Sequence, residues 1–520
     1  MSVDAIVVGS GPNGLVAANL LAQAGWEVVV LEEAATPGGG VRSAELTEPG
    51  FVSDVCSSFY PLARASPHIA ALELERFGLR WRQAPLALAH PGRDGSCAAI
   101  GGEPEQTAAS LEQFASGDGD AWLRLCDGWG RLGPALLRML FDPFPPLRGA
   151  AQALRATGPV AALGLARAGA MGVRALGEEL FAGAGARRLL AGNALHADLS
   201  PEAPPGAVYG LLLCMLAQHA GFPVVEGGAQ GLTTALVRRL EARGGRVECG
   251  RRAVAIEVGS GRARAVVTAG GERFEARRAV LADVGAPQLY RELLDPARLT
   301  PRMRARVERF RYDASTFKVD WSLDGPIPWS APPARRAGTV HVAEGVDALA
   351  RYAADLAQER VPSEPFLIVG QYAAYDATRA PAGKETAWAY THVPQGLRWE
   401  AAEVARVLDL VERQVEALAP GFRAVVRARH VLAPPDLERE NRNLAGGAIN
   451  GGTTQLHQQL VFRPVAGSLA RAETPVAGLY LASASAHPGG GVHGACGANA
   501  ARAALARVSL AGRLSRRLQR

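Results

Sequence analysis

The stretch Asp4-Ala5-Ile6-Val7-Val8-Gly9-Ser10-Gly11-Pro12-Asn13-Gly14 decides the fold of this 520-residue chain. Its first half is a short apolar run of the kind that forms a buried parallel strand. Its second half carries glycines with the spacing GxGxxG, and residues 15–24 then have the composition of a helix, which Gly25 ends. Residues 27–31 predict the next strand. Strand, glycine turn, helix and strand within about thirty residues are typical of a dinucleotide-binding Rossmann unit.

Each residue of the glycine turn has a physical task in such a unit. Gly9 permits the tight turn, Gly11 lets the backbone approach a pyrophosphate, and Gly14 lets the helix pack close to the strand. Pro12 and Asn13 then open the helix, whose N-terminus offers free N–H groups and a positive dipole end to phosphates. These five residues are predicted to contact the cofactor.

An acidic residue ends the second strand, about twenty residues after the turn, where a ribose is bound in this kind of fold. Glu32 is placed to accept hydrogen bonds from ribose hydroxyls, and Glu33 is the second choice. A further glycine stretch follows at once, which is unexpected for a simple NAD dehydrogenase. It favours the extended body of FAD, and its predicted contacts are Gly39, Gly40, Val41, Arg42 and Ser43.

The C-terminal part of the chain predicts a second approach to the same cofactor. A strand at 478–482 leads into Ala486-His487-Pro488-Gly489-Gly490-Gly491-Val492-His493-Gly494, and small residues then form a helix. A helix N-terminus here would stabilise the negative charge of reduced flavin. The predicted contacts are Ser485, Gly490, Gly491 and Val492.

These two motifs resemble the phytoene desaturase-like branch of the glutathione-reductase-type flavoproteins, and within it the subgroup named for a pyridine nucleotide-disulfide oxidoreductase domain. Residues 196–201, 227–232 and 450–464 look similar to that family as well. The resemblance implies an α/β fold, in which a glutathione-reductase-type FAD-binding Rossmann domain is interleaved with a mixed α+β substrate domain. It also implies that Val254 presents backbone to the adenine end.

The chain departs from the family pattern at two neighbouring positions. Ser483 stands where the family usually has glycine, which alters the approach to the flavin ring. Ala484 replaces the acidic residue of amine-oxidase relatives, which argues against an amine oxidase. The domain boundaries that follow from the composition are 1–75, 225–295 and 471–520 for the FAD-binding domain, and 76–224 (a helical insert) and 296–470 for the substrate domain.

Composition and charge exclude several other classes of protein. Hydrophobic residues make up 48% of the chain and charged residues 20%, as in a folded globular protein. The net charge of +6 comes from scattered arginines without an aromatic-lined basic stripe, so nucleic-acid binding is not expected. The six cysteines form no CxxC pair, which predicts neither disulfides nor a metal site and fits a cytoplasmic location. A strand begins almost at residue 1, so no leader peptide is expected.

Two apolar stretches raise the question of a membrane. The run 209–225 is too short for a span, and the run 158–177 is interrupted by Arg167 and Arg174. A buried helix is the favoured interpretation of the second run. Contact with a bilayer from one side is the alternative.

The predicted function is an FAD-dependent dehydrogenase that desaturates a carbon–carbon bond of a lipophilic, polyene or isoprenoid-like substrate by hydride transfer to flavin N5. A second GxGxxG after a strand is absent from the sequence, so oxygen or a quinone is the expected electron acceptor. The alternatives are a saturase or isomerase that uses reduced FAD, and a catalytically silent flavin-binding protein.

Three candidates for chemistry beyond the flavin remain open at this stage. His487 precedes the glycine loop and could carry the substrate proton, or it could only brace the loop. His196 and Asp198 could form a polar pair near the substrate. Cys496 could hold flavin covalently, although a buried cysteine among small residues is the ordinary finding.

Overall fold

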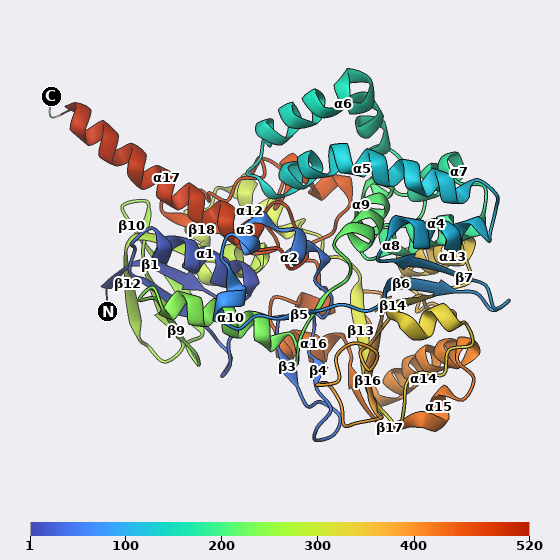
Figure 1. Ribbon diagram of the computed structural model, residues 1–520. Helices are drawn as coiled ribbons and strands as arrows, with labels where there is room; N and C mark the ends of the chain where they lie inside the picture. Colours follow the sequence, from blue (N-terminus) through green and yellow to red (C-terminus); the bar gives the residue numbers. More distant parts are fainter. Residues whose placement is uncertain (1, 519–520) are drawn as a thin grey trace.

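The computed structural model describes residues 2–518, without the side chains of Ala161 and of residues 510–518. In this range two large sheets lie side by side, and helices cover them (Figure 1). The first sheet has the order β10-β11-β12-β1-β2-β9, and β18 pairs with β12. Its strands are β1 Ser2–Val8, β2 Val28–Leu31, β9 Arg246–Glu248, β10 Ala253–Gly259, β11 Arg262–Thr268, β12 Arg273–Ala282 and β18 Leu479–Leu481.

Strand β1 is buried on both faces, as its continuous apolar sequence predicts. Ala5 and Val7 pack with helices α1 (Pro12–Gln23) and α17 (Ala495–Leu518) on one face. Ile6 packs with β10 and β11 on the other face. Strands β2, β9, β12 and β18 run parallel to their neighbours in this core, so the loops that follow them meet at one edge of the sheet. The predicted Rossmann unit is confirmed.

The second sheet has the order β17-β13-β16-β15-β14-β6-β7. Its strands are β6 Leu86–Pro91, β7 Cys97–Gly101, β13 Ser315–Leu323, β14 Ala337–Val342, β15 Leu367–Gln371, β16 Glu385–Val393 and β17 Val426–Leu432. One face packs on the amphipathic helix α14 (Ala401–Leu418). The other face packs on helices of the insert.

Strands β6 and β7 correct the prediction that residues 76–224 are helical. Both are rich in alanine, which has a high intrinsic helix propensity. They form strands because β6 pairs with β14, a strand far away in the sequence, and β7 pairs with β6. Tertiary pairing therefore overrides local propensity at this point.

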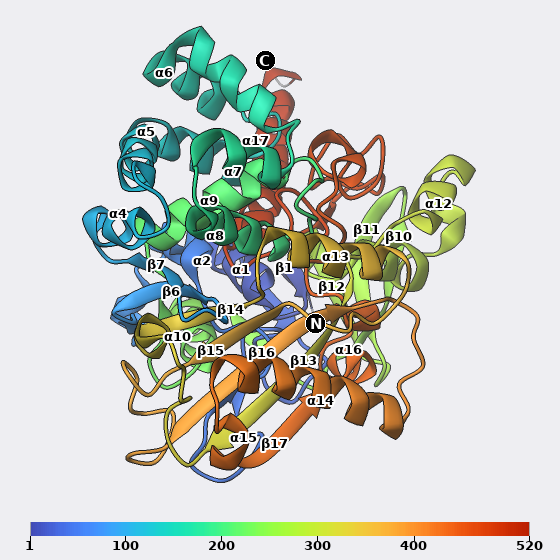
Figure 2. The same cartoon turned by 90° about the vertical axis from the view of Figure 1, so that its right-hand side faces the viewer.

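Residues 104–219 of the insert form helices, namely α4 Pro104–Glu112, α5 Asp118–Phe141, α6 Leu147–Ala168, α7 Val173–Leu180, α8 Ala184–Leu195 and α9 Gly206–His219. Helices α8 and α9 pack on the second sheet, whereas α6 lies on the outside, at the top of Figures 1 and 2. The prediction of a buried helix at 158–177 is wrong for its first part, since Val160 is 83% exposed and Leu163 is 72% exposed. None of the described helices has the length and apolar character needed to cross a membrane.

The remaining elements lie in the connections between these strands and helices. They are β3 Ser43–Ala44, β4 Ser53–Asp54, α2 Pro61–Ala65, α3 Pro67–Ala70, β5 Trp81–Arg82, β8 Val224–Val225, α10 Gln230–Glu241, α11 Ala286–Gln288, α12 Pro301–Glu308, α13 Val346–Ala357, α15 Phe422–Val425, α16 Pro434–Glu440 and several single helical turns. The first sheet draws its strands from residues 2–31, 246–282 and 479–481, and the second from 86–101 and 315–432. The chain thus passes repeatedly between the layers, which is the interleaved α/β arrangement that the sequence predicts.

Candidate flavin and substrate site

A cavity of about 730 Å³ joins the glycine turn of the first sheet to the face of the second sheet. Its walls include most of the predicted cofactor contacts, which are Gly9, Gly11, Pro12, Asn13, Glu32, Glu33, Gly39, Gly40, Val41, Arg42, Val254, Ser485, Gly491 and Val492. Gly14, Ser43, Gly490 and His487 are not among the residues that line it.

The glycine turn leaves no room for larger residues. A Cβ on Gly11 would lie 2.6 Å from Oδ2 of Asp283, and a Cβ on Gly14 would lie 2.3 Å from the carbonyl oxygen of Gly9. Gly39, from the second glycine stretch, packs against Gly11, since a Cβ there would lie 3.1 Å from the Gly11 Cα. The two glycine stretches therefore form one compact floor at the N-terminus of α1.

Asp283 is a site residue that the sequence prediction did not include. It follows β12, which is parallel to β1, so the carboxylate reaches the same edge of the sheet. Its Oδ2 accepts a hydrogen bond of 2.8 Å from the N–H of Gly14. Burial raises the pKa of Asp283 to about 7, against the opposing effect of that amide. The signal that could have revealed it is the short apolar run 279–282, which has the composition of a buried strand and ends directly before this acidic residue.

Glu32 retains capacity for a ligand. Its carboxylate accepts hydrogen bonds from the Ser10 N–H at 2.9 Å, the Ser10 hydroxyl at 2.5 Å and the Ala34 N–H at 2.8 Å. A carboxylate has about four acceptor positions, so one remains for a ribose hydroxyl. Glu33 also lines the cavity but is half-exposed and pairs with Arg252.

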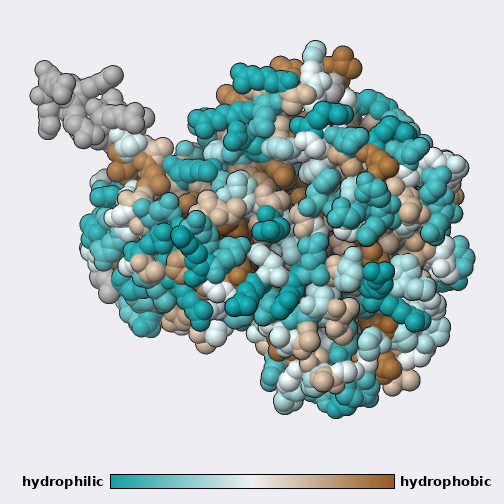
Figure 3. Space-filling model, viewed as in Figure 1, coloured by the Kyte–Doolittle hydropathy of each residue, from teal (hydrophilic) through white to brown (hydrophobic). Residues whose placement is uncertain are grey.

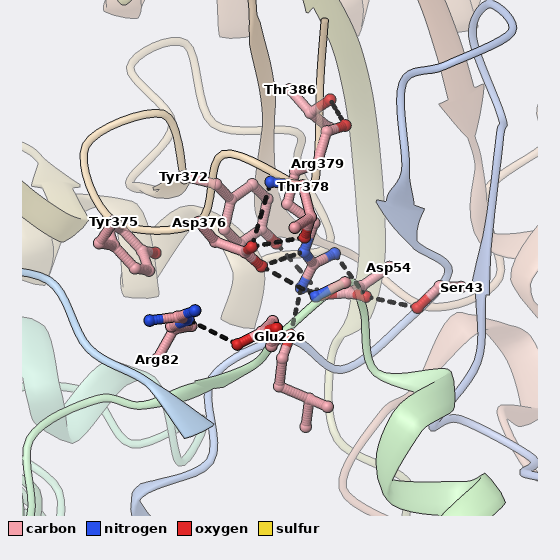
Figure 4. A network of polar contacts seen from close by, with 12 residues as sticks. Ser43, Asp54, Arg82, Glu226, Tyr372, Tyr375, Asp376, Thr378, Arg379 and Thr386 are labelled. Carbon is pink, nitrogen blue, oxygen red and sulfur yellow. Dashed lines mark hydrogen bonds and ion pairs between the residues drawn. The ribbon is translucent and has the colours of Figure 1, made fainter. Parts of the chain in front are cut away.

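Ser43 contributes to a buried network beside the cavity rather than to its wall (Figure 4). Its hydroxyl donates to Asp54, which forms two contacts of 3.0 Å with the guanidinium of Arg379. Arg379 also pairs with Asp376 and stacks over the Tyr372 ring at 4.3 Å. Burial opposes ionisation of Asp54, yet Arg379 and its other donors hold the pKa of Asp54 below its usual value.

This network holds three parts of the molecule together. Asp54 belongs to β4, near the second glycine stretch, and it accepts the N–H of Ala229 just before α10. Arg379 belongs to the loop between β15 and β16 of the second sheet. The cofactor end and the substrate end of the cavity are thereby fixed relative to each other.

The C-terminal loop closes the cavity from another side. Ser485 donates its hydroxyl to the carbonyl of Gly451 at 2.8 Å and accepts the N–H of Ala286 at 3.1 Å. Gly490 lies directly behind the wall, since a Cβ there would lie 2.9 Å from the backbone of Asn450. Its small size is needed for that packing.

His487 does not belong to this wall. It is buried, its ring lies 5.8 Å from the Phe144 ring, and it shares a backbone hydrogen bond with Asp142 of the α5–α6 connection. Burial lowers the pKa of His487 to about 4. Cys496 is also buried and off the wall, with its Sγ 3.5 Å from the carbonyl oxygen of Ala486. Neither position gives direct access to the cavity.

The end of the cavity next to the second sheet, here called the substrate arm, is lined mainly by apolar and aromatic residues. Its wall consists of Phe59, His196, Leu213, Phe222, Thr316, Lys318, Thr339, Ile368, Trp388 and Tyr390. Lys318 is buried and pairs with Asp320. No carboxylate belongs to this part of the described wall. Among the large aromatic residues of this region, Trp388 lines the cavity, whereas Tyr209, Trp321, Phe366 and Tyr372 do not.

His196 places a titratable group on the wall of the substrate arm. Its Nε2 lies 2.7 Å from Nε2 of His341, a residue of β14. Burial lowers the pKa of His196 to about 3, and it also lowers that of His341, so both rings are neutral near pH 7. One ring must then donate its Nε2–H in a hydrogen bond to the unprotonated Nε2 of the other. Gly192 of α8 makes room for this pair, since a Cβ there would lie 2.4 Å from Nδ1 of His341.

Asp198 is not the partner of His196 among the described contacts. Its Oδ2 accepts the N–H of Ala314 at 3.2 Å, and burial together with the charge of Asp313 raises the pKa of Asp198 to about 7. The signal for the pair that does form was weak, because His196 and His341 are 145 residues apart.

The cavity wall has the donors and acceptors that a long polar cofactor requires. Two buried side-chain atoms on it, Oδ1 of Asn13 and Nδ2 of Asn450, have no partner within the described part of the protein. The N-terminus of α1 and the remaining acceptor position of Glu32 lie on the same wall. These residues fit FAD, with its pyrophosphate at the glycine turn and its ribose at Glu32.

Comparison with known proteins identifies the family. The sequence profile described as flavin containing amine oxidoreductase matches residues 13–505. The chain belongs to that family. Its cofactor is FAD, and it is an FAD-dependent oxidoreductase.

Several relatives are similar over nearly the whole chain. The pyridine nucleotide-disulfide oxidoreductase domain-containing protein 2 of Mus musculus is 29% identical, over 96% of this chain and 92% of that protein. The neurosporene-forming phytoene desaturase of Cereibacter sphaeroides is 26% identical, over 96% and 94%. A structure of putrescine oxidase bound to putrescine superposes with a TM-score of 0.62 at 17% identity, over 98% of this chain and 99% of that one. This last likeness shows the fold alone.

Proposed function

We propose that the protein is a dehydrogenase that introduces a carbon–carbon double bond into a lipophilic, polyene or isoprenoid-like substrate. The observation that carries this proposal is the chemistry of the substrate arm. Apolar and aromatic side chains form most of its wall, and the charge of Lys318 is balanced by its buried partner Asp320. A protonated amine would find no carboxylate on this wall, whereas an uncharged hydrocarbon is favoured. The likeness to phytoene desaturases supports the same substrate class.

The cofactor end of the cavity binds and orients FAD in this proposal. The glycine turn and α1 receive the pyrophosphate, Glu32 receives the ribose, and Gly491 and Val492 close the site near the flavin ring. When bound, FAD supplies the acceptor for one hydride from the substrate. The apolar wall of the substrate arm excludes water from the reacting carbons.

His196 is the proposed acceptor of the proton that is lost from the neighbouring carbon. One C–H bond gives up a hydride, the next gives up a proton, and the electron pair left behind forms the new double bond. Loss of the hydride makes the neighbouring C–H bond strongly acidic, so His196 can take the proton despite its lowered pKa. Its Nδ1 is the accepting atom in the tautomer whose Nε2–H is donated to His341. His341 orients the ring. This assignment replaces His487, which lies off the wall, as the first candidate.

The same histidine pair supports one alternative, a saturase or isomerase. A proton held on Nδ1 of His196 could be delivered to a substrate carbon, with the hydride coming from reduced FAD. For desaturation, the proposed electron acceptor is oxygen or a quinone, because the sequence carries no second glycine fingerprint for a nicotinamide nucleotide.

Anaerobic reduction of the flavin tests the proposed function. The FAD-loaded protein is mixed with phytoene in detergent micelles, with a shorter acyclic isoprenoid, and with putrescine as the amine control. Loss of the flavin absorbance with an isoprenoid and not with putrescine supports the proposal. Bleaching by the amine alone contradicts it. Turnover that occurs only when FAD is reduced beforehand establishes the saturase or isomerase instead.

A further inference from the structure

Exposed apolar side chains are concentrated in two segments of the protein. Of the ten large hydrophobic residues that are most exposed in the described part, four lie on α6 and four lie between residues 456 and 469. They are Leu147 (70%), Leu154 (50%), Val160 (83%) and Leu163 (72%) on α6, and Leu456, Leu460, Phe462 and Leu469 in the second segment. Single exposed apolar residues are normal on a protein surface, but such a concentration marks an interaction site.

The two segments lie toward the same side of the molecule. Helix α6 is at the top of both ribbon views, and the orange-red segment 456–469 lies in the upper half of both (Figures 1 and 2). Figure 3 shows brown, hydrophobic residues at the top of the surface, where α6 lies. The segment is held there by contacts such as that between Gln459 and Tyr209 of α9.

The shape of α6 presents its apolar residues in two groups. Gly158 has φ +76° and ψ 174°, which divides the helix into two stretches. Leu147 and Leu154 are seven residues apart in the first stretch, and Val160 and Leu163 are three apart in the second, so each pair shares a face. A helix with such faces on the outside of a protein suits the interface of a bilayer rather than its interior.

The charge of this side is positive. The sequence contains no aspartate or glutamate from Pro143 to Gly177 or from Asn441 to Ala472. A groove between α5 and α6 is lined by Arg138, Arg148 and Arg155 together with Leu147, Ala151, Gln152 and Ala156. None of these three arginines forms an ion pair with another described residue, whereas Arg167 near the end of α6 pairs with Glu179.

We propose that α6 and segment 456–469 form a docking face for a bilayer that contains anionic phospholipids. The groove arginines bind headgroup phosphates, and the exposed leucines and valine enter the boundary between headgroups and acyl chains. A hydrophobic protein partner would explain the apolar residues but not the unpaired arginines beside them. This inference deepens the proposed function, for which a lipophilic substrate would arrive from a membrane, but its test does not depend on turnover.

Flotation of the FAD-loaded protein with lipid vesicles tests the docking face. The vesicles consist of phosphatidylcholine alone or of phosphatidylcholine with phosphatidylglycerol. We expect binding to the anionic vesicles only, with weakening as salt is added, because exposed charges are screened. Added inorganic phosphate at the same ionic strength should not displace the protein, since free phosphate lacks the apolar part of the interaction.

Two variants separate the contribution of the apolar side chains to vesicle binding from that of the arginines, and two control variants accompany them. The variant Leu147→Ser/Leu154→Ser/Leu163→Ser should lose vesicle binding. The variant Arg148→Gln/Arg155→Gln should bind about fivefold more weakly per arginine removed. Val508→Ser, an exposed apolar residue on α17, and Arg302→Gln/Arg304→Gln on α12 should bind as the parent does. The flavin spectrum of each variant shows that the fold is retained.

Three results would overturn the proposal. The first is that the parent protein floats with neither kind of vesicle. The second is that the leucine variant binds anionic vesicles as well as the parent does. The third is that sedimentation shows a dimer of the parent that the leucine variant loses, without vesicle binding, because the face would then be an interface between two copies of this chain.

Discussion

The two ends of the cavity are built in different ways. At the cofactor end, the wall comes from a few contiguous stretches, and the turn at 9–11 and the stretch at 39–42 contain glycines at which a Cβ would be crowded. At the substrate end, single residues from β13, β14, β15, β16 and the α8–α9 region meet across long sequence distances. A motif in the sequence can therefore describe the first end, whereas the second exists only once the sheets have assembled. The predictions below test whether that division holds.

The largest effect is expected at the glycine turn. Gly11→Val should give a colourless protein without FAD, because even the Cβ would lie 2.6 Å from Asp283 and the backbone could no longer approach the pyrophosphate. Absorbance of the purified protein and chromatography of the released cofactor measure this. Gly128→Ala, in a helical position with no atom within 4 Å of the added Cβ, should remain yellow. A yellow Gly11→Val protein would remove the turn from the cofactor site.

What the sequence could predict follows from this division. The turn at Gly11, the acid at Glu32 and the strands of the first sheet depend on local geometry. The structure forms those strands and places Gly11 and Glu32 on the wall of one cavity. Strand β6 was missed because its partner β14 is more than two hundred residues away in the sequence. The contact between His196 and His341 was missed for the same reason.

The next effect concerns the network that joins the two ends. Asp54→Asn should lower the free energy of unfolding by about 3–5 kcal/mol, because it leaves the buried Arg379 without its main counter-charge. Urea unfolding measures this. As a control, Asp409→Asn removes one partner of an exposed ion pair and should change the free energy of unfolding by less than about 1 kcal/mol. Equal effects of the two substitutions would show that the network does not connect the domains.

The same carboxylate predicts a pH dependence. The pKa of folded Asp54 lies below its ordinary value of 3.8. The stability that it contributes is therefore fully present above about pH 4 and is lost as the pH falls through the folded pKa. The stability difference between the parent protein and Asp54→Asn should thus shrink on acidification below pH 4. If the stability difference between the two proteins stays constant below pH 4, the pKa of folded Asp54 is not lowered.

A smaller effect is expected when the two histidines are compared. His196→Asn should slow anaerobic flavin reduction by a substrate about a hundredfold, because the proton acceptor on the wall is lost, and should leave FAD affinity unchanged. His487→Ala should instead loosen FAD and leave the reduction rate of flavin-replete protein nearly unchanged, because His487 only supports the loop. Titration with FAD measures the affinity of both variants, and stopped-flow absorbance measures their rate of flavin reduction. If His487→Ala slows reduction and His196→Asn only loosens FAD, His487 is the proton acceptor.

The smallest effect is expected at the ribose acid. Glu32→Gln keeps an acceptor but loses the charge, so FAD should bind about tenfold more weakly, as for a charge-assisted hydrogen bond. The dissociation constant, measured by flavin fluorescence, reports the change. Glu33→Gln, at a half-exposed position, should have little effect. If Glu33→Gln weakens FAD binding more than Glu32→Gln does, Glu33 and not Glu32 binds the ribose.

The central claim is that the substrate end accepts a hydrocarbon and the cofactor end takes two electrons from it. One anaerobic turnover tests this directly, with FAD-loaded protein, excess isoprenoid substrate and mass analysis of the product. The account predicts one equivalent of product per flavin reduced, lighter than the substrate by two hydrogen atoms and with one more carbon–carbon double bond. Flavin reduction that yields an imine or aldehyde from an amine, with the isoprenoid unchanged, would contradict it.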